Sequence, residues 1–169
     1  MRCQEMTEAC GTRMQPSPRR VIFVCTGNTC RSPMAAAVAN ALACARDGDH
    51  PALVATSAGL YALEGDPITA HAVEALECAG IKAVKGLDYH AHTAHTVTDA
   101  DAEEAEQLIA VSASHAMELL LRFPAAAHKI VCMPHAISDP FGGDLARYEA
   151  CLAEITDGVK ELLFGEATQ

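Results

Sequence analysis

A cysteine and an arginine frame one short stretch, VIFVCTGNTCRSPMA at residues 21–35. Cys25 follows four apolar residues, and Arg31 comes six positions later, directly before Ser-Pro. A loop between a strand and a helix aims backbone N–H groups and the positive end of the helix dipole at one point, which suits an anion. Arg31 adds a planar fork that can hold two oxygens of a phosphate. The combination favours a phosphate site with a thiolate nucleophile at Cys25 over a buried, inert cysteine.

Two residues inside this loop suit an unusual backbone conformation. Gly27 permits a positive φ or a close approach of the backbone to a ligand, and Asn28 tolerates the left-handed region. A C-x5-R spacing alone recurs by chance. The apolar strand before it, the Gly and Asn within it and the Arg-Ser-Pro that opens a helix after it make the pattern specific.

A second candidate group lies downstream, in SDPFGG at residues 138–143. Transfer of a phosphoryl group to a thiolate requires a proton for the departing group, and a positioned carboxylic acid can supply it. Asp139 is the predicted acid, and in a second step the same carboxylate would activate water as a base. Pro140 would stiffen the turn. Because Asp-Pro is an ordinary turn signal, this prediction depends on the cysteine loop.

Alternating apolar and alanine-rich segments must position these groups. Strands are predicted at 21–25, 52–59, 107–112 and 129–133, and helices at 32–46, 68–80, 99–105, 113–123 and 145–165. Ser32 would cap the first helix, and Gly80 would end the second. The alternation predicts an α/β fold, a single domain with a four-stranded parallel sheet and helices on both faces. Ligands bind at the carboxyl ends of such strands, where Cys25 and the loop of Asp139 both fall.

Composition narrows the function classes. The chain has 169 residues and a formal net charge of −10 without a long basic run, which argues against nucleic acid or an anionic membrane as partner. The N-terminus lacks the apolar core of a secretion signal, and no apolar run approaches the roughly 20 residues of a membrane span. Eight cysteines without a C-x-x-C pair favour reduced thiols in the cytoplasm. Residues 1–18 are predicted to be a disordered extension, and 19–166 the functional domain.

These motifs resemble the low-molecular-weight protein tyrosine phosphatase family. VCTGNTCRSPMA is similar to the family signature almost position for position, and the segments TSAG, HAVEAL, RFP and SDP fall where the family has similar ones. The resemblance covers about residues 20–165. It implies a cysteine-dependent phosphatase that acts on phosphorylated proteins through a cysteinyl-phosphate intermediate and needs neither a cofactor nor a metal.

The resemblance also assigns roles to residues. Cys25 becomes the nucleophile, Arg31 the phosphate clamp and Asp139 the general acid. The implied substrate-binding residues are Thr26, Gly27, Asn28, Thr29, Cys30, Ser32, Leu63 and Phe141. Ser32 would donate to the thiolate, while Asn28, Ser57 and His92 would hold the loop in its strained shape. The family usually has Glu at the position of Ala36, a departure that weakens the case for His92.

Further departures bear on the substrate. Tyrosine-specific members have a bulky aliphatic residue at the position of Thr29, and many have an aromatic residue at the position of Leu63. Together with DPFGG, these differences resemble the protein-arginine phosphatase branch. A hydroxyl beside the phosphate suits a flat, polar phosphoguanidinium better than a phenyl ring. Thr29 could also be a simple β-branched spacer, so a tyrosine phosphatase is the alternative.

Other interpretations carry less support. Thioredoxin-coupled arsenate reductases have a similar loop but need a shuttling cysteine pair, and Cys78 has no neighbouring cysteine downstream. A non-catalytic phosphate-binding module would not need nucleophile, clamp and acid together. The histidines of HAHTAH, residues 90–95, lack the partners of a metal site.

Cys30 could either trap an oxidised Cys25 as a disulfide, as family members do, or simply pack in the loop. Tyr148 is interpreted as a packing residue.

Overall fold

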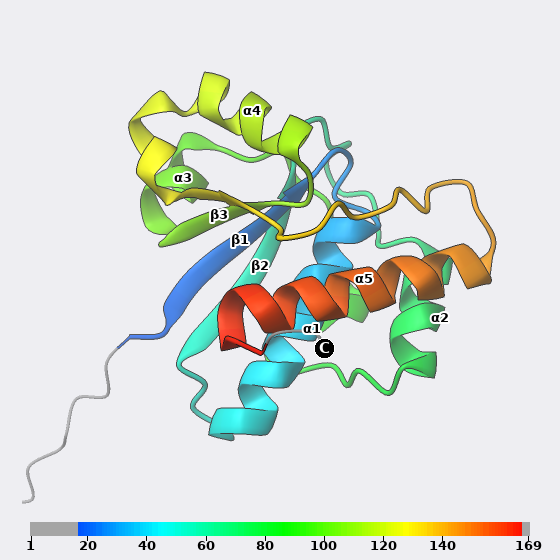
Figure 1. The fold of residues 1–169 in the computed structure, drawn as a ribbon. Helices are drawn as coiled ribbons and strands as arrows, with labels where there is room; N and C mark the ends of the chain where they lie inside the picture. The colour runs from blue at the N-terminus through cyan, green and yellow to red at the C-terminus, as the bar shows by residue number, and fades with distance from the viewer. Residues whose placement is uncertain (1–16, 167–169) are drawn as a thin grey trace, which may run out of the picture.

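The computed structural model describes residues 17–166, in which strands and helices alternate along the chain (Figure 1). The strands are β1 Arg19–Cys25, β2 Leu53–Gly59, β3 Gln107–Ala110 and β4 Ile130–Cys132. The α-helices are α1 Arg31–Asp47, α2 Ala70–Cys78, α3 Asp99–Glu104, α4 Ala113–Arg122 and α5 Leu145–Phe164. Two short 3₁₀ helices are also present. η1 Tyr89–Ala91 lies in a segment without a predicted element, and η2 Pro124–Lys129 extends to the first residue of the last predicted strand. Every predicted strand and helix is present, with ends displaced by at most two residues.

The sheet is parallel throughout, in the order β2-β1-β3-β4. The predicted four-stranded parallel α/β fold is therefore confirmed. β1 lies between β2 and β3, with Cys25 opposite Gly59 on one side and Val24 opposite Ala110 on the other. Connections leave β1 and β3 toward opposite edges of the sheet, which opens a crevice at the carboxyl end of β1.

The sheet is covered on both faces, and the side chains of β1 alternate between two cores. Val21, Phe23 and Cys25 pack with α1, α2 and α5, whereas Ile22 and Val24 pack with α3 and α4. All five are nearly inaccessible to solvent, as expected for a central strand of a parallel sheet. The small side chains of the alanine-rich α1 allow it to pack closely against β2 and α5. Cys25 therefore ends a rigid strand.

The beginning of α1 differs from the prediction. The helix starts at Arg31, its N-cap is Cys30, and no side chain caps it. Ser32 is thus inside the helix and is not its cap, because its hydroxyl is used elsewhere, in contact with the sulfur of Cys25. The end of α2 agrees with the prediction, since Gly80 follows the helix in the left-handed region with φ 71°.

Part of the predicted domain division lies beyond what the structure describes. Residues 1–16 of the predicted extension 1–18 fall outside the described residues, so the extension and the domain boundaries remain predictions. Within residues 17–166, no helix combines the length and the apolar character that crossing a membrane requires.

Candidate active site

Cys25 lies at the floor of the site, at the point where β1 ends. Its side chain is almost fully buried, and its Sγ is 3.0 Å from Oγ of Ser32, in the first turn of α1. The Ser32 hydroxyl also lies 3.2 Å from the carbonyl of Ala58 in β2. A hydroxyl has one proton, which it can donate either to this carbonyl or to a Cys25 thiolate. The geometry therefore offers a thiolate a hydrogen bond from Ser32.

Asn28 organises the loop beneath the site. Its φ of 58° makes it the one non-glycine residue with positive φ in the described chain. Its fully buried amide donates to Oγ of Ser32 at 3.0 Å and of Ser57 at 2.9 Å, and its Oδ1 accepts from the backbone N–H of His95 at 3.0 Å. Its carbonyl accepts from Nε2 of His92 at 2.7 Å. The structure thus brings together all three residues expected to support the loop.

His92 keeps this contact although no Glu stands at position 36. Burial lowers the pKa of His92, which outweighs the opposing effect of its bond to the Asn28 carbonyl. A neutral ring that donates Nε2–H to a carbonyl carries no proton on Nδ1. Ala36 and His92 both line a cavity of about 500 Å³ behind the loop. The case for His92 as a supporting residue is therefore stronger in the structure than the departure at Ala36 indicated.

The glycine on which the loop depends differs from the one that the sequence indicated. Gly27 does not have a positive φ, and a Cβ there would meet only Oγ1 of Thr29, at 3.8 Å. At Gly59, the last residue of β2, a Cβ would lie 2.7 Å from the carbonyl oxygen of Thr26 and 3.1 Å from Cβ of Asn28. The absence of a side chain at Gly59 lets β2 and the loop pack in direct contact.

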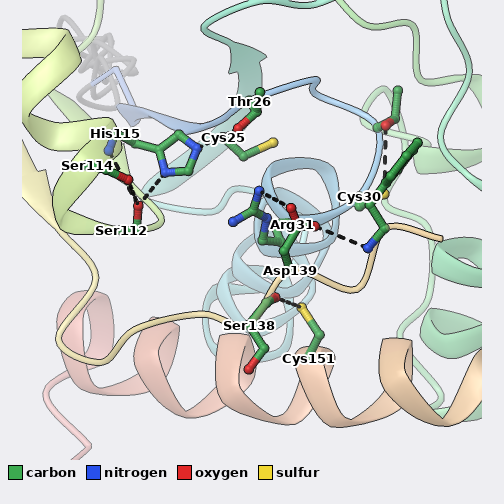
Figure 2. A network of polar contacts seen from close by, with 12 residues as sticks. Cys25, Thr26, Cys30, Arg31, Ser112, Ser114, His115, Ser138, Asp139 and Cys151 are labelled. Atoms are coloured by element: carbon green, nitrogen blue, oxygen red, sulfur yellow. Dashed lines mark hydrogen bonds and ion pairs between the residues drawn. The ribbon is translucent and has the colours of Figure 1, made fainter. Parts of the chain in front are cut away.

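Arg31 and Asp139 meet across the site (Figure 2). Nη2 of Arg31 is 3.2 Å from Oδ2 of Asp139, on the segment between β4 and α5. The arginine side chain is 9% exposed and the aspartate side chain 57%. Oδ1 of Asp139 accepts from the backbone N–H of Phe141 at 3.1 Å, which fixes the carboxylate on its turn. The predicted clamp and the predicted acid are therefore neighbours.

A cavity of about 240 Å³ opens at this point. Its lining consists of Cys25, Thr26, Gly27, Thr29, Cys30, Arg31, Asp139 and Phe141. Three of the residues expected to bind substrate are not part of the lining. Asn28 and Ser32 are fully buried beneath the loop, where they support it. Leu63 is 72% exposed on the segment after β2, where the neighbouring Tyr61 donates its hydroxyl proton to Glu118 of α4.

Sequence reasoning missed two contacts of this loop. His115 in α4 places Nε2 2.9 Å from Oγ1 of Thr26. The sequence feature that could have indicated this contact is a histidine three residues after Ser112, the serine that caps α4 next to the end of β3. Tyr148 in α5 is buried, as its interpretation as a packing residue requires, but its hydroxyl also lies 3.3 Å from Sγ of Cys30. The pKa of Tyr148 is raised to about 12, mainly by burial, so the phenol keeps its proton and can donate it in a hydrogen bond.

The three histidines of residues 90–95 contact different partners. His90 contacts Glu77 and Asp88, His92 bonds the loop, and His95 lies 3.5 Å from Asp101. In the part of the chain that the structure describes, no group of three His, Cys, Asp or Glu side chains is arranged to hold a metal ion. The disulfide considered for Cys30 stays a prediction, because the described cysteines are free thiols.

A parallel α/β sheet with a cysteine, an arginine and an aspartate around one cavity at the end of the central strand is typical of a cysteine-dependent phosphatase. The comparisons with known proteins agree with this class. The family model of the low molecular weight phosphotyrosine protein phosphatases matches residues 20–169, and the chain belongs to this family. The protein is thus a protein phosphatase, a hydrolase. The match gives no support to the arsenate reductase alternative.

Relatives of both substrate types are similar to the chain. A protein-arginine-phosphatase of Geobacillus stearothermophilus is 34% identical over 145 residues, which are 82% of this chain and 89% of the relative. A low molecular weight protein tyrosine phosphatase from T. tengcongensis superimposes with a TM-score of 0.77 at 33% identity, covering 88% of this chain and 99% of the other. A YwlE arginine phosphatase mutant with a phosphorylated active-site serine superimposes with a TM-score of 0.73 at 30% identity. The superposition covers 85% of this chain and 92% of the mutant's chain.

Proposed function

We propose that the protein hydrolyses phosphoarginine in proteins through a cysteinyl-phosphate on Cys25. The Cys25 thiolate attacks phosphorus, so that an S–P bond forms while the P–N bond to the guanidine breaks. Arg31 holds the phosphate oxygens, and Asp139 donates its proton to the departing nitrogen. Asp139 then takes a proton from the water that breaks the S–P bond, which releases phosphate and restores the thiolate.

The ion pair of Arg31 and Asp139 fits this sequence of steps. A bound phosphate would compete with the carboxylate for the guanidinium. The released carboxylate would take up a proton from solvent or from the bound phosphate and then donate it to the leaving nitrogen. Ser32 supports the same step, because its hydroxyl lies 3.0 Å from Sγ of Cys25 and can stabilise the thiolate as it leaves in the second half-reaction. The phosphorylated serine in the related YwlE mutant is in keeping with a covalent intermediate.

One observation carries the substrate assignment: the cavity wall bears oxygens. Thr26, Thr29 and Asp139, whose side chains all carry oxygen atoms, are among its lining residues. A phosphoguanidinium presents N–H donors, which need acceptors in a desolvated site. The printed name of the Geobacillus stearothermophilus relative, a protein-arginine-phosphatase, supports the same substrate. Phosphorylated proteins are therefore the proposed partners, and the free thiols of the described cysteines fit the reducing cytoplasm proposed as the compartment.

Phe141 favours a second candidate, phosphotyrosine. Its ring lines the cavity and is 72% exposed, so it can pack against a phenyl ring of a substrate. The test is kcat/KM of the full-length protein on two peptides that differ only in carrying phosphoarginine or phosphotyrosine. We expect the phosphoarginine peptide to be preferred. A preference for the phosphotyrosine peptide would overturn the substrate assignment and leave the second candidate.

Thr29 provides the matched variants for this test. Thr29→Ile removes a hydroxyl and adds apolar bulk, and we expect the relative kcat/KM to swing toward phosphotyrosine by about 10²-fold. Thr29→Val removes the hydroxyl with little change in size, and Thr29→Ser keeps it. If Val shifts the preference and Ser does not, the hydroxyl is responsible. An unchanged preference in all three variants would make Thr29 a spacer.

A further inference from the structure

His115 lies next to the site, in contact with Thr26, and belongs neither to the cysteine loop nor to the lining of the cavity. It is the third residue of α4 and is 7% exposed. Nε2 is 2.9 Å from Oγ1 of Thr26, and Nδ1 is hydrogen-bonded to Oγ of Ser112, which is itself 2.9 Å from Oγ of Ser114 (Figure 2). Because both ring nitrogens have partners, the imidazole is held at both ends.

Thr26, the partner of His115, stands at the mouth of the cavity. It directly follows Cys25, is exposed and is one of the lining residues. Its backbone carbonyl accepts from the N–H of Tyr61 at 2.9 Å, so main chain and hydroxyl are both fixed. Without His115 the hydroxyl would be free to rotate.

The hydroxyl of Thr26 remains an acceptor in either tautomer of His115. If Nε2–H donates to Oγ1, one lone pair of the oxygen is left, and if the hydroxyl donates to Nε2, two are left. Burial, and next the nearby positive charge of Arg31, lower the pKa of His115, while the charge of Asp139 acts in the opposite direction. The neutral ring fixes Thr26 without adding a second positive charge to the site.

We infer that His115 is a positioning residue that holds Thr26 so that its hydroxyl oxygen accepts an N–H from the guanidinium of phosphoarginine. The inference rests on the proposed function and names a further determinant of its substrate preference. A guanidinium has donors and no acceptor, whereas the ring of phosphotyrosine has no donor for this oxygen. Thr26 and Thr29 both line the cavity, and the several N–H groups of one guanidinium can serve both hydroxyl oxygens.

The experiment measures the ratio of kcat/KM for the phosphoarginine and phosphotyrosine peptides. His115→Leu should lower this ratio about 10-fold, the effect of one lost hydrogen bond. His115→Gln should restore most of it, because a glutamine amide can reach the place of Nε2. Thr26→Val should lower the ratio as His115→Leu does, and Thr26→Ser should not. The double variant of His115→Leu and Thr26→Val should fall no further than Thr26→Val alone, since one residue acts through the other.

Each contrary result has its own meaning. An equal loss on both peptides in His115→Leu would overturn the inference, because it indicates a structural role. Additive losses in the double variant would overturn it as well. If His115→Leu fails to fold, as its thermal unfolding would reveal, the comparison of Thr26→Val with Thr26→Ser decides, since Thr26 is exposed. A wild-type protein inactive on phosphoarginine would instead refute the proposed function itself.

Discussion

The guanidinium of Arg31 and the carboxylate of Asp139 lie 3.2 Å apart although 108 positions separate them in the chain. Arg31 is fixed in the first turn of α1, and Asp139 stands on the turn between β4 and α5. The ion pair keeps both groups at the cavity before a substrate arrives, and a bound phosphate would take the place of the carboxylate on Arg31.

Asp139→Asn tests the carboxylate. We expect turnover of phosphoarginine to fall by roughly 10²-fold or more, the usual contribution of a general acid. The loss should be smaller for p-nitrophenyl phosphate, whose leaving group needs no proton. Inorganic phosphate should inhibit the variant more strongly, because a negative charge beside the anion is removed. Asp157→Asn, on the exposed face of α5, is the matched control. An equal loss on both substrates would point to a structural role for Asp139.

Asn28 should be more important for stability than any other residue of the loop support. Asn28→Ala removes three side-chain hydrogen bonds and places alanine at a φ of 58°. Asn28→Gly removes the bonds but suits the backbone, and Ser57→Ala removes one bond. We expect the free energy of unfolding to fall by about 1 kcal/mol for Ser57→Ala, and by more for Asn28→Gly. Asn28→Ala should cost about 1 kcal/mol beyond Asn28→Gly. Urea unfolding that ranks Asn28→Gly below Asn28→Ala in stability would contradict the strain at Asn28.

Gly59 and Gly27 form a matched pair for a second test. Gly59→Ala forces the carbonyl of Thr26 to move, because the new Cβ would stand 2.7 Å from its oxygen. We expect a loss of about 1–3 kcal/mol in stability together with a loss of kcat/KM. Gly27→Ala meets an atom only at 3.8 Å, and its thermal unfolding should stay near that of wild type. The reverse order of the two unfolding temperatures would show that the loop does not pack on β2 in this way.

The pH dependence of stability should reveal the buried His92. Burial lowers its pKa below the ordinary value of 6.5, so the unfolded chain takes up this proton at a higher pH than the folded protein. Stability is therefore lost as the pH falls through 6.5 toward the folded pKa. His90 acts oppositely, because its bonds to Glu77 and Asp88 raise its pKa.

His92→Gln separates these effects. The glutamine amide can still donate to the Asn28 carbonyl but does not titrate, and His90 is retained. As the pH is lowered from about 8 to about 5.5, the unfolding temperature should fall less in the variant than in wild type. Parallel curves for the two proteins would contradict a lowered pKa at His92.

The chemistry-bearing residues could be predicted because each is marked by its neighbours along the chain. Cys25 ends an apolar run, Arg31 opens a helix, and Asp139 precedes a proline. The fold class could be predicted because apolar strand segments alternate with alanine-rich helical segments, which is also a local property of the sequence. The role of Gly59 could not be predicted, because it depends on the separation of two strands that are paired in space. His115 was missed because its partner lies 89 positions away.

The identity of the phosphorylated residue tests the mechanism most directly. The Asp139→Asn variant should form the intermediate from p-nitrophenyl phosphate but hydrolyse it slowly, because the base for water is missing. Rapid quenching and mass spectrometry of its peptides then locate the phosphate. We predict phosphate on Cys25, and none on the protein when Cys25→Ala is added to the variant. Phosphate on any other residue, or turnover that persists in Cys25→Ala, would contradict a cysteinyl-phosphate mechanism.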